Sequence, residues 1–235
     1  HQSAAKYYER SLRGINASDN MITYTYNVTN LAECWIKLGE YVDASKLLNE
    51  CLELARNNVS RHAESVVLRV IGTLDEALGD LNKALSYYKK AEAINDIHGN
   101  IYTGILLSMA VGRIYIKSGA WEQGESTLKH ALLSSVNLGE RSFQYQIHEL
   151  LSEVYESQKD SVQALYHYRQ YHTIKESIYN RQSEQFISSL RMIFERKSSL
   201  DRSETSTVEA RTVETRTVEA SAVEDGFDPS AKQLE

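Results

Sequence analysis

The stretch LAECWIKLGEYVDASKLLNECLEL, residues 31–54, decides the fold because it returns three times at a spacing of 40 residues. The later copies align with it without gaps: IGTLDEALGDLNKALSYYKKAEAI (71–94), VGRIYIKSGAWEQGESTLKHALLS (111–134) and LSEVYESQKDSVQALYHYRQYHTI (151–174). An internal period of this length indicates stacked supersecondary units, each too small to bury its apolar face alone.

Two columns of this alignment have the residue types that a helical hairpin needs. The small column consists of Ala44, Ala84, Gly124 and Ala164. The turn column consists of Gly39, Gly79, Gly119 and Lys159. Small residues let two antiparallel helices cross closely, and a turn glycine ends the first helix in the left-handed conformation at no steric cost. One period earlier, Ala4 falls on the small column, so the opening AAKYYERSL is predicted to be the second helix of a truncated repeat.

A third column has bulky residues that are expected to fill the space between hairpins. It consists of Trp35, Asp75, Tyr115 and Tyr155. Asp75 departs from the pattern, and an unpaired buried carboxylate costs several kcal/mol. Asp75 is therefore expected to be paired with a lysine or tyrosine, or exposed where the repeat is irregular.

Composition favours helices throughout the chain. The only proline is Pro229, so nothing before it would break a helix by removing a backbone N–H. A net charge of −6 argues against nucleic acid as a partner, because phosphate binding needs clustered lysine and arginine. No apolar run reaches roughly 18 residues, which argues against a membrane span. Cys34 and Cys51 lack the spacing of a metal site or disulfide framework, which suggests a reducing compartment. From the rarity of proline we expect an all-α protein, and from the cysteines a location in the cytoplasm.

These columns resemble the tetratricopeptide repeat over about residues 1–180. The period is longer than the common form of about 34 residues, and it is similar to longer-helix variants in bacterial regulators and eukaryotic scaffold proteins. The resemblance implies a right-handed α-solenoid of antiparallel helical hairpins, with half a repeat followed by four full repeats.

The resemblance also implies a partner-binding groove lined by the first helix of each hairpin. Carried over by register, its residues are Asn30, Glu33, Lys37, Arg69, Thr73, Glu76, Arg113, Lys117, Glu149 and Glu153. The first three repeats contribute basic side chains and the fourth contributes carboxylates, so the groove would orient a dipolar peptide or a partner helix. The lysine–asparagine arrangement with which some family members clamp a C-terminal carboxylate is absent.

A second interpretation of these charges stays open. They would then form a solvated face whose members pair between neighbouring repeats, for example Arg69 with Glu33 or Arg113 with Glu76.

The chain after Ile174 is expected to leave the repeats. Ile178, Phe186, Leu190, Ile193 and Phe194 form a helical stripe, which predicts an exit or capping helix over residues 181–197. The join resembles the end of repeat domains in bacterial signalling proteins, where a similar helix leads into a cyclase or kinase module. Residues 198–235 carry a pentapeptide period (TVEAR, TVETR, TVEAS) that buries no stripe on a helix or strand, so a disordered tail is predicted.

The sequence contains no constellation that predicts catalysis, a metal site or a cofactor. His148 and Glu149 are not followed by a second histidine at zinc-motif spacing, and His167 and His172 do not share a helix face. The histidines are therefore expected to be structural or solvated, and the cysteines to serve packing.

Our leading hypothesis is a protein- or peptide-binding module, not an enzyme, cut from a larger bacterial signalling protein. It would bind its partner in the groove and have no nucleic-acid or membrane partner. One alternative is a structural scaffold that forms a homodimer through residues 175–196. Another is the repeat domain of a nucleotide cyclase or kinase whose catalytic module lies outside this chain.

Overall fold

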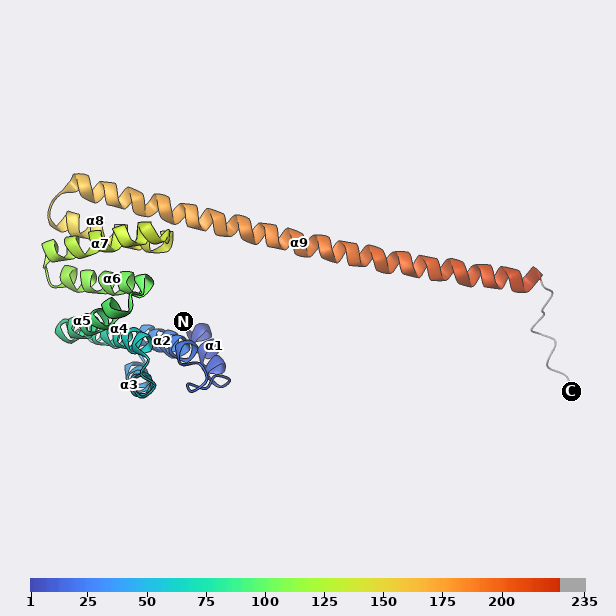
Figure 1. Cartoon of the computed structure of the whole chain (residues 1–235). Coiled ribbons are helices and arrows are strands. Elements are labelled where there is room, and N and C mark those ends of the chain that lie inside the picture. Colours follow the sequence, from blue (N-terminus) through green and yellow to red (C-terminus); the bar gives the residue numbers. More distant parts are fainter. Residues whose placement is uncertain (225–235) are drawn as a thin grey trace. The chain divides into compact units, whose positions relative to one another are not determined.

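The structure, a computed structural model, describes the backbone of residues 1–224 and the side chains of residues 1–193 other than His98. This described part consists of α-helices without strands, as predicted (Figure 1). The helices are α1 (Gln2–Leu12), α2 (Met21–Leu38), α3 (Tyr41–Asn57), α4 (Arg61–Ala77), α5 (Leu81–His98), α6 (Ile101–Lys117), α7 (Trp121–Leu138), α8 (Arg141–Ser157) and α9 (Ser161–Glu224).

The predicted 40-residue period is the spacing of the hairpins. The first helices α2, α4, α6 and α8 begin at residues 21, 61, 101 and 141, and each is followed by an antiparallel second helix. Helix α1 packs on α2, as a second helix does on the next repeat. Side-chain caps at Asn20, Asp80 and Asn100 accept hydrogen bonds from backbone N–H groups and mark three of the helix starts.

The turns within hairpins all use the left-handed backbone. Gly39, Gly79 and Gly119 have φ of 82°, 86° and 76°, and Lys159 adopts φ 63° at the same position. Lys159 therefore departs from the glycine column in residue type, but it keeps the left-handed turn of the other hairpins. A second left-handed column, which sequence analysis missed, lies between hairpins at Val59, Gly99 and Gly139.

The small column is buried at the hairpin crossing, where Ala44 and Ala84 have no exposed surface. The first helices contribute small residues of their own. A Cβ on Gly72 would lie 2.6 Å from a ring carbon of Tyr88, and one on Gly112 would lie 2.7 Å from Leu128. The close approach of the two helices therefore rests on small residues from both sides.

The first helices form the inner layer of the solenoid. Helix α2 packs on α4, α4 on α6, and α6 on α8, whereas no comparable contact joins α3 to α5 or α5 to α7 among the described residues. A stack whose first helices meet while its second helices stay apart curves towards the first helices. Their exposed side chains therefore share one concave surface.

Asp75 does not make its repeat irregular, contrary to expectation. Helices α4, α6 and α8 have 17 residues each, and the α4–α5 turn has the same left-handed residue as its neighbours. Asp75 is half-buried, and its carboxylate accepts no hydrogen bond among the described residues. Asp75 therefore replaces a bulky side chain with a smaller one and leaves the backbone of its hairpin regular.

The chain divides into two units, His1–Ile178 and Tyr179–Glu235, so the first boundary lies close to the predicted end of the repeats. Helix α9 contains the predicted exit helix and continues to Glu224, whereas a disordered tail was expected from residue 198. Glutamate, alanine and arginine have high helix propensity, and a helix can form from them without a buried stripe. Phe194 of the predicted stripe and residues 225–235 of the predicted tail lie outside the described side chains and backbone, respectively.

Candidate functional site

The concave surface holds a pocket that draws on all four first helices. We call this pocket, with a volume of about 630 Å³, the inner groove. Six of the ten predicted binding residues line it: Asn30, Glu33, Lys37, Arg69, Thr73 and Arg113. The register therefore predicted correctly that these six residues, which are up to 83 positions apart in the chain, lie in one pocket.

Arg69 and Glu33 form an ion pair across the first two repeats. The Arg69 Nη2 lies 3.0 Å from the Glu33 Oε1, and the Arg69 side chain is only 16% exposed. Its Nε is buried and has no hydrogen-bond partner among the residues that the structure describes. A buried guanidinium needs its carboxylate, so this pair holds the floor of the groove in one arrangement.

Glu76 joins repeats two and three. Its carboxylate accepts hydrogen bonds from Lys117 Nζ at 2.7 Å, from Arg113 Nε at 3.4 Å and from the Tyr88 hydroxyl at 2.9 Å. Burial disfavours the charged carboxylate, but Arg113, Lys117 and Tyr88 outweigh that effect and hold the pKa of Glu76 below its ordinary value. Glu76 and Lys117 thus belong to the wall beside the groove and do not line the pocket.

These contacts contain both inter-repeat pairs of the second interpretation, Arg69 with Glu33 and Arg113 with Glu76. They do not neutralise the surface, because among the described residues these ion pairs offer two carboxylates, Glu33 and Glu76, to the four cations Lys37, Arg69, Arg113 and Lys117. Lys37 is exposed and takes part in no ion pair within the described residues. The inner groove therefore keeps an excess of positive charge.

The predicted acidic residues of repeat four lie elsewhere. Glu149 and Glu153 are exposed on α8 and do not line the inner groove, to which α8 contributes Gln146. Register alone would have placed Glu153 in the pocket, because it is the repeat-four equivalent of Glu33, Thr73 and Arg113, which line it. A column that sequence analysis missed, consisting of Tyr26, Val66, Leu106 and Gln146, lines the pocket in every repeat. These four residues are 40 positions apart, but they differ in polarity and size, so the alignment did not indicate a shared role.

Aromatic side chains line the same pocket. Tyr26 is 43% exposed with its hydroxyl 3.1 Å from His62 Nε2, and Tyr102 is 51% exposed with its ring packed on Phe143. The inner groove thus combines exposed aromatic rings, amide side chains and cations. Such a surface can hold an extended segment by stacking, hydrogen bonds and charge.

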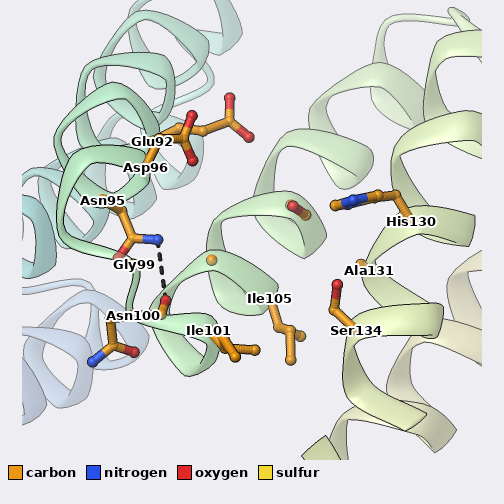
Figure 2. Close-up of a pocket in the computed structure, with 12 residues that line it drawn as sticks. Glu92, Asn95, Asp96, Gly99, Asn100, Ile101, Ile105, His130, Ala131 and Ser134 are labelled. Carbon is orange, nitrogen blue, oxygen red and sulfur yellow. Dashed lines mark hydrogen bonds between the residues drawn. The ribbon is translucent and has the colours of Figure 1, made fainter. Parts of the chain in front are cut away.

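A separate pocket of about 380 Å³ lies between α5, α6 and α7 (Figure 2). Glu92 and Asp96 lie one turn apart on α5, and His130 faces them from α7. Burial, together with the charge of Asp96, raises the pKa of Glu92. Asn95 closes one side of the pocket by donating to the Asn100 carbonyl at 3.1 Å. None of the predicted groove residues lines this pocket.

The expectation of structural histidines is met at His148 and His167, which form a buried pair in repeat four. Their Nδ1 atoms are 2.8 Å apart, and the His167 ring stacks on Tyr155. Burial and then the neighbouring His167 lower the pKa of His148 to about 4. The sequence does not predict this pair, because nothing in a spacing of 19 positions indicates that α8 and α9 meet there.

Both cysteines are buried, as expected for packing residues. Burial raises the pKa of Cys51 to about 11, against the effect of a hydrogen bond to Thr25, so its thiol is a poor nucleophile. Within the described residues, no group of three or more histidine, cysteine, aspartate or glutamate side chains could hold a metal ion. None of the described helices combines the length and apolar composition of a bilayer span.

Comparison with known proteins supports the repeat assignment. The family model of the tetratricopeptide repeat matches residues 22–96. No curated protein matches the chain. The crystal structure of BtubC (BKLC) from P. vanneervenii is similar in fold, with a TM-score of 0.64 and 18% identity over 100% of this chain and 94% of that one.

Two further solved structures are similar to part of the chain. One is the STAND signal transduction ATPase with a tetratricopeptide repeat sensor from Pyrococcus horikoshii, with a TM-score of 0.60 and 17% identity over 76% of this chain and 27% of that one. The other is a Rap protein complexed with Competence and Sporulation Factor, with a TM-score of 0.53 and 15% identity over 75% of this chain and 59% of that one.

The class of protein follows from the fold and from this match. The chain is an all-α repeat protein, and its residues 22–96 match the tetratricopeptide repeat.

Proposed function

We propose that the inner groove binds an extended segment of a partner protein or peptide. The observation that carries this proposal is one pocket built from α2, α4, α6 and α8 together, with polar, aromatic and cationic side chains on its wall. Residues that only solvate a face would not need to converge on a shared pocket.

The excess of positive charge favours a partner with an acidic side chain near Lys37 and Arg113. Charge at this position would set the register and the association rate more than the affinity. Tyr26 and Tyr102 would receive an apolar or aromatic side chain of the same segment, because their rings are half-exposed.

The similar structures support a binding role without identifying the partner. The Rap protein was solved in complex with Competence and Sporulation Factor, and the STAND protein's repeats are described as a sensor. By analogy, the present chain would be the non-catalytic regulatory part of a bacterial signalling protein in the cytoplasm. The functional division of the chain into repeats (1–180), an exit helix (181–197) and a tail (198–235) stays a prediction.

The proposal is tested with a displayed library of random peptides selected on the wild-type chain. Enriched peptides are then measured on the groove variant Asn30→Ala/Lys37→Glu. The matched control is Asn82→Ala/Lys89→Glu, which makes the same changes on the exposed surface of α5. We expect acidic peptides whose affinity falls about tenfold or more on the groove variant and stays within about twofold on the control. Peptides that bind all three proteins equally would contradict the assignment of the groove.

A second candidate function is self-association through α9. Ile187, Leu190 and Ile193 on this helix are each about half or more exposed, and Phe186 is 63% exposed. A helical surface this apolar is typical of an interaction site. The homodimer through residues 175–196 therefore stays a proposal beside peptide binding.

A further inference from the structure

A surface pocket lies where Asp75 breaks the bulky column. It has a volume of about 540 Å³ and is lined by α3, α4 and α5; we call it the outer pocket. Tyr41 and Ser45 come from α3, Ile71 and Asp75 from α4, and Tyr87 from α5. Its volume lies within the range of about 300–1,000 Å³ that is common for ligand pockets.

Repeat four shows what normally fills this place. Tyr155, two periods after Asp75, is 6% exposed and lies between α7 and α9. Its hydroxyl donates to Glu125 Oε1 on α7 at 2.9 Å, and its ring stacks on His167 of α9 at 5.3 Å with an interplanar angle of 11°. The aromatic ring is therefore the wedge between two successive second helices.

The same wedge position is open in repeat two, and its walls are intact. Two periods before Glu125, Lys129 and His167 stand Ser45, Asn49 and Tyr87, and all three line the outer pocket. Tyr87 offers a ring where His167 offers one to Tyr155. Ser45 and Asn49 offer hydrogen-bonding groups where Glu125 accepts the tyrosine hydroxyl. Asp75 is too short to occupy the space.

We propose that the outer pocket is a second binding site, which takes an aromatic ring bearing an O–H or N–H donor, of the phenol or indole kind. The ring inserts between α3 and α5, stacks on Tyr87 and places its polar group near Ser45 and Asn49. The Asp75 carboxylate, which has no hydrogen bond within the described residues, is a further acceptor at the pocket wall. The site lies on the opposite side of α4 from the inner groove and is independent of it.

Two sources can supply this chemistry. One is a tyrosine or tryptophan side chain of a partner protein, and the other is a free small aromatic molecule. Both need the same open wedge position, so they share one test of the site and differ in a second measurement.

The test titrates phenol and indole into the full chain and follows backbone amide signals by NMR, with cyclohexanol as the non-aromatic control of similar size. Asp75→Tyr fills the position from within the chain, and Asp75→Asn removes the charge but keeps the pocket. We expect saturable binding to the wild type and to Asp75→Asn. On Asp75→Tyr the affinity is expected to fall about tenfold or more. Asp75→Tyr should also melt at a higher temperature, because it completes the column.

A second variant keeps the test valid if Asp75→Tyr does not fold. Ser45→Trp blocks the same pocket from α3 and leaves α4 unchanged. Equal binding of phenol or indole to the wild type and to a folded blocked variant would overturn the proposal, and so would equal binding of cyclohexanol. These results are independent of the inner groove, where Asp75 and Ser45 do not lie.

The source of the ring is decided with N-acetyl-tyrosine amide. Tighter binding than phenol indicates a protein side chain, because the added groups are those of a peptide backbone. Binding no tighter than phenol indicates a free aromatic molecule. Either result supports the site.

Discussion

At the scale of single residues, the concave surface is organised by carboxylates that serve two repeats at once. Glu76 lies on α4 and accepts from Arg113 and Lys117 of α6, while Glu33 holds Arg69 across the preceding junction. Because Glu33 and Glu76 are each paired with a cation of the next repeat, this part of the groove is preformed. A preformed surface loses less side-chain entropy when a partner binds.

The histidine pair predicts how stability depends on pH. Burial lowers the pKa of His148 to about 4, and burial together with the positive charge of Lys129 lowers the pKa of His167. Between about pH 6.5 and about pH 4 the unfolded chain takes up protons that the folded chain refuses, so stability falls as the pH falls. We expect His148→Asn to remove on the order of 2–3 kcal/mol of that pH-dependent loss, measured by urea unfolding at several pH values.

The exposed His172 on α9 supplies the control. His172→Asn makes the same exchange at an exposed histidine outside the buried pair, and its profile is compared with that of His148→Asn. Parallel profiles for the wild type and His148→Asn would show that the pair does not carry the effect. Protonation would also place two N–H groups against each other at the 2.8 Å contact, which adds repulsion to the cost of burial.

At the scale of elements, two of the left-handed turns have a residue other than the glycine that the repeat favours. Val59 has φ 53° where Gly99 and Gly139 stand in the later repeats, and Lys159 takes the place of a turn glycine. Left-handed backbone is unfavourable for residues with a Cβ, above all for β-branched ones. The fold imposes the turn on these residues because the helices on both sides are held by packing.

Val59→Gly is therefore expected to stabilise the protein by roughly 0.5–1 kcal/mol, since relief of strain exceeds the entropy that glycine loses. Val59 is 77% exposed, so little packing is removed with its side chain. The change is measured by thermal or urea unfolding. Gly99→Val, the reverse change at the equivalent turn, should destabilise the protein, and a loss of stability in Val59→Gly would refute the argument.

At the scale of the whole molecule, the apolar surface of α9 is the feature that the repeats do not explain. The repeat unit ends at Ile178, and its last core residues, such as Leu151 and Ile174, lie before that point. A chain of residues 1–178 should therefore keep the cooperative unfolding of the repeats.

Light scattering then tests self-association. If α9 forms the dimer interface, the full chain has twice the monomer mass and residues 1–178 alone are monomeric. Phe186→Gln/Leu190→Gln/Ile193→Gln in the full chain should give the monomer mass as well, because it removes the apolar side chains and keeps the helix. A full chain that stays monomeric at high concentration would contradict self-association through α9.

The sequence by itself determined the repeat, its hairpin turns and its crossing residues. With the resemblance, it also predicted six of the residues that line the inner groove. It could do so because each repeat contacts only its neighbours, so every required residue type recurs after 40 positions. It also indicated both inter-repeat ion pairs, Arg69 with Glu33 and Arg113 with Glu76, because register places them on adjacent first helices.

Only the tertiary structure decided which side chains from different repeats reach one another. It joined His148 to His167, brought Tyr26, Leu106 and Gln146 into one pocket, and kept Glu149 and Glu153 out of it. It also showed that Asp75 opens a pocket and does not distort its hairpin. Such outcomes depend on side-chain length and on the angle between packed helices, and neither quantity is written in the period of the sequence.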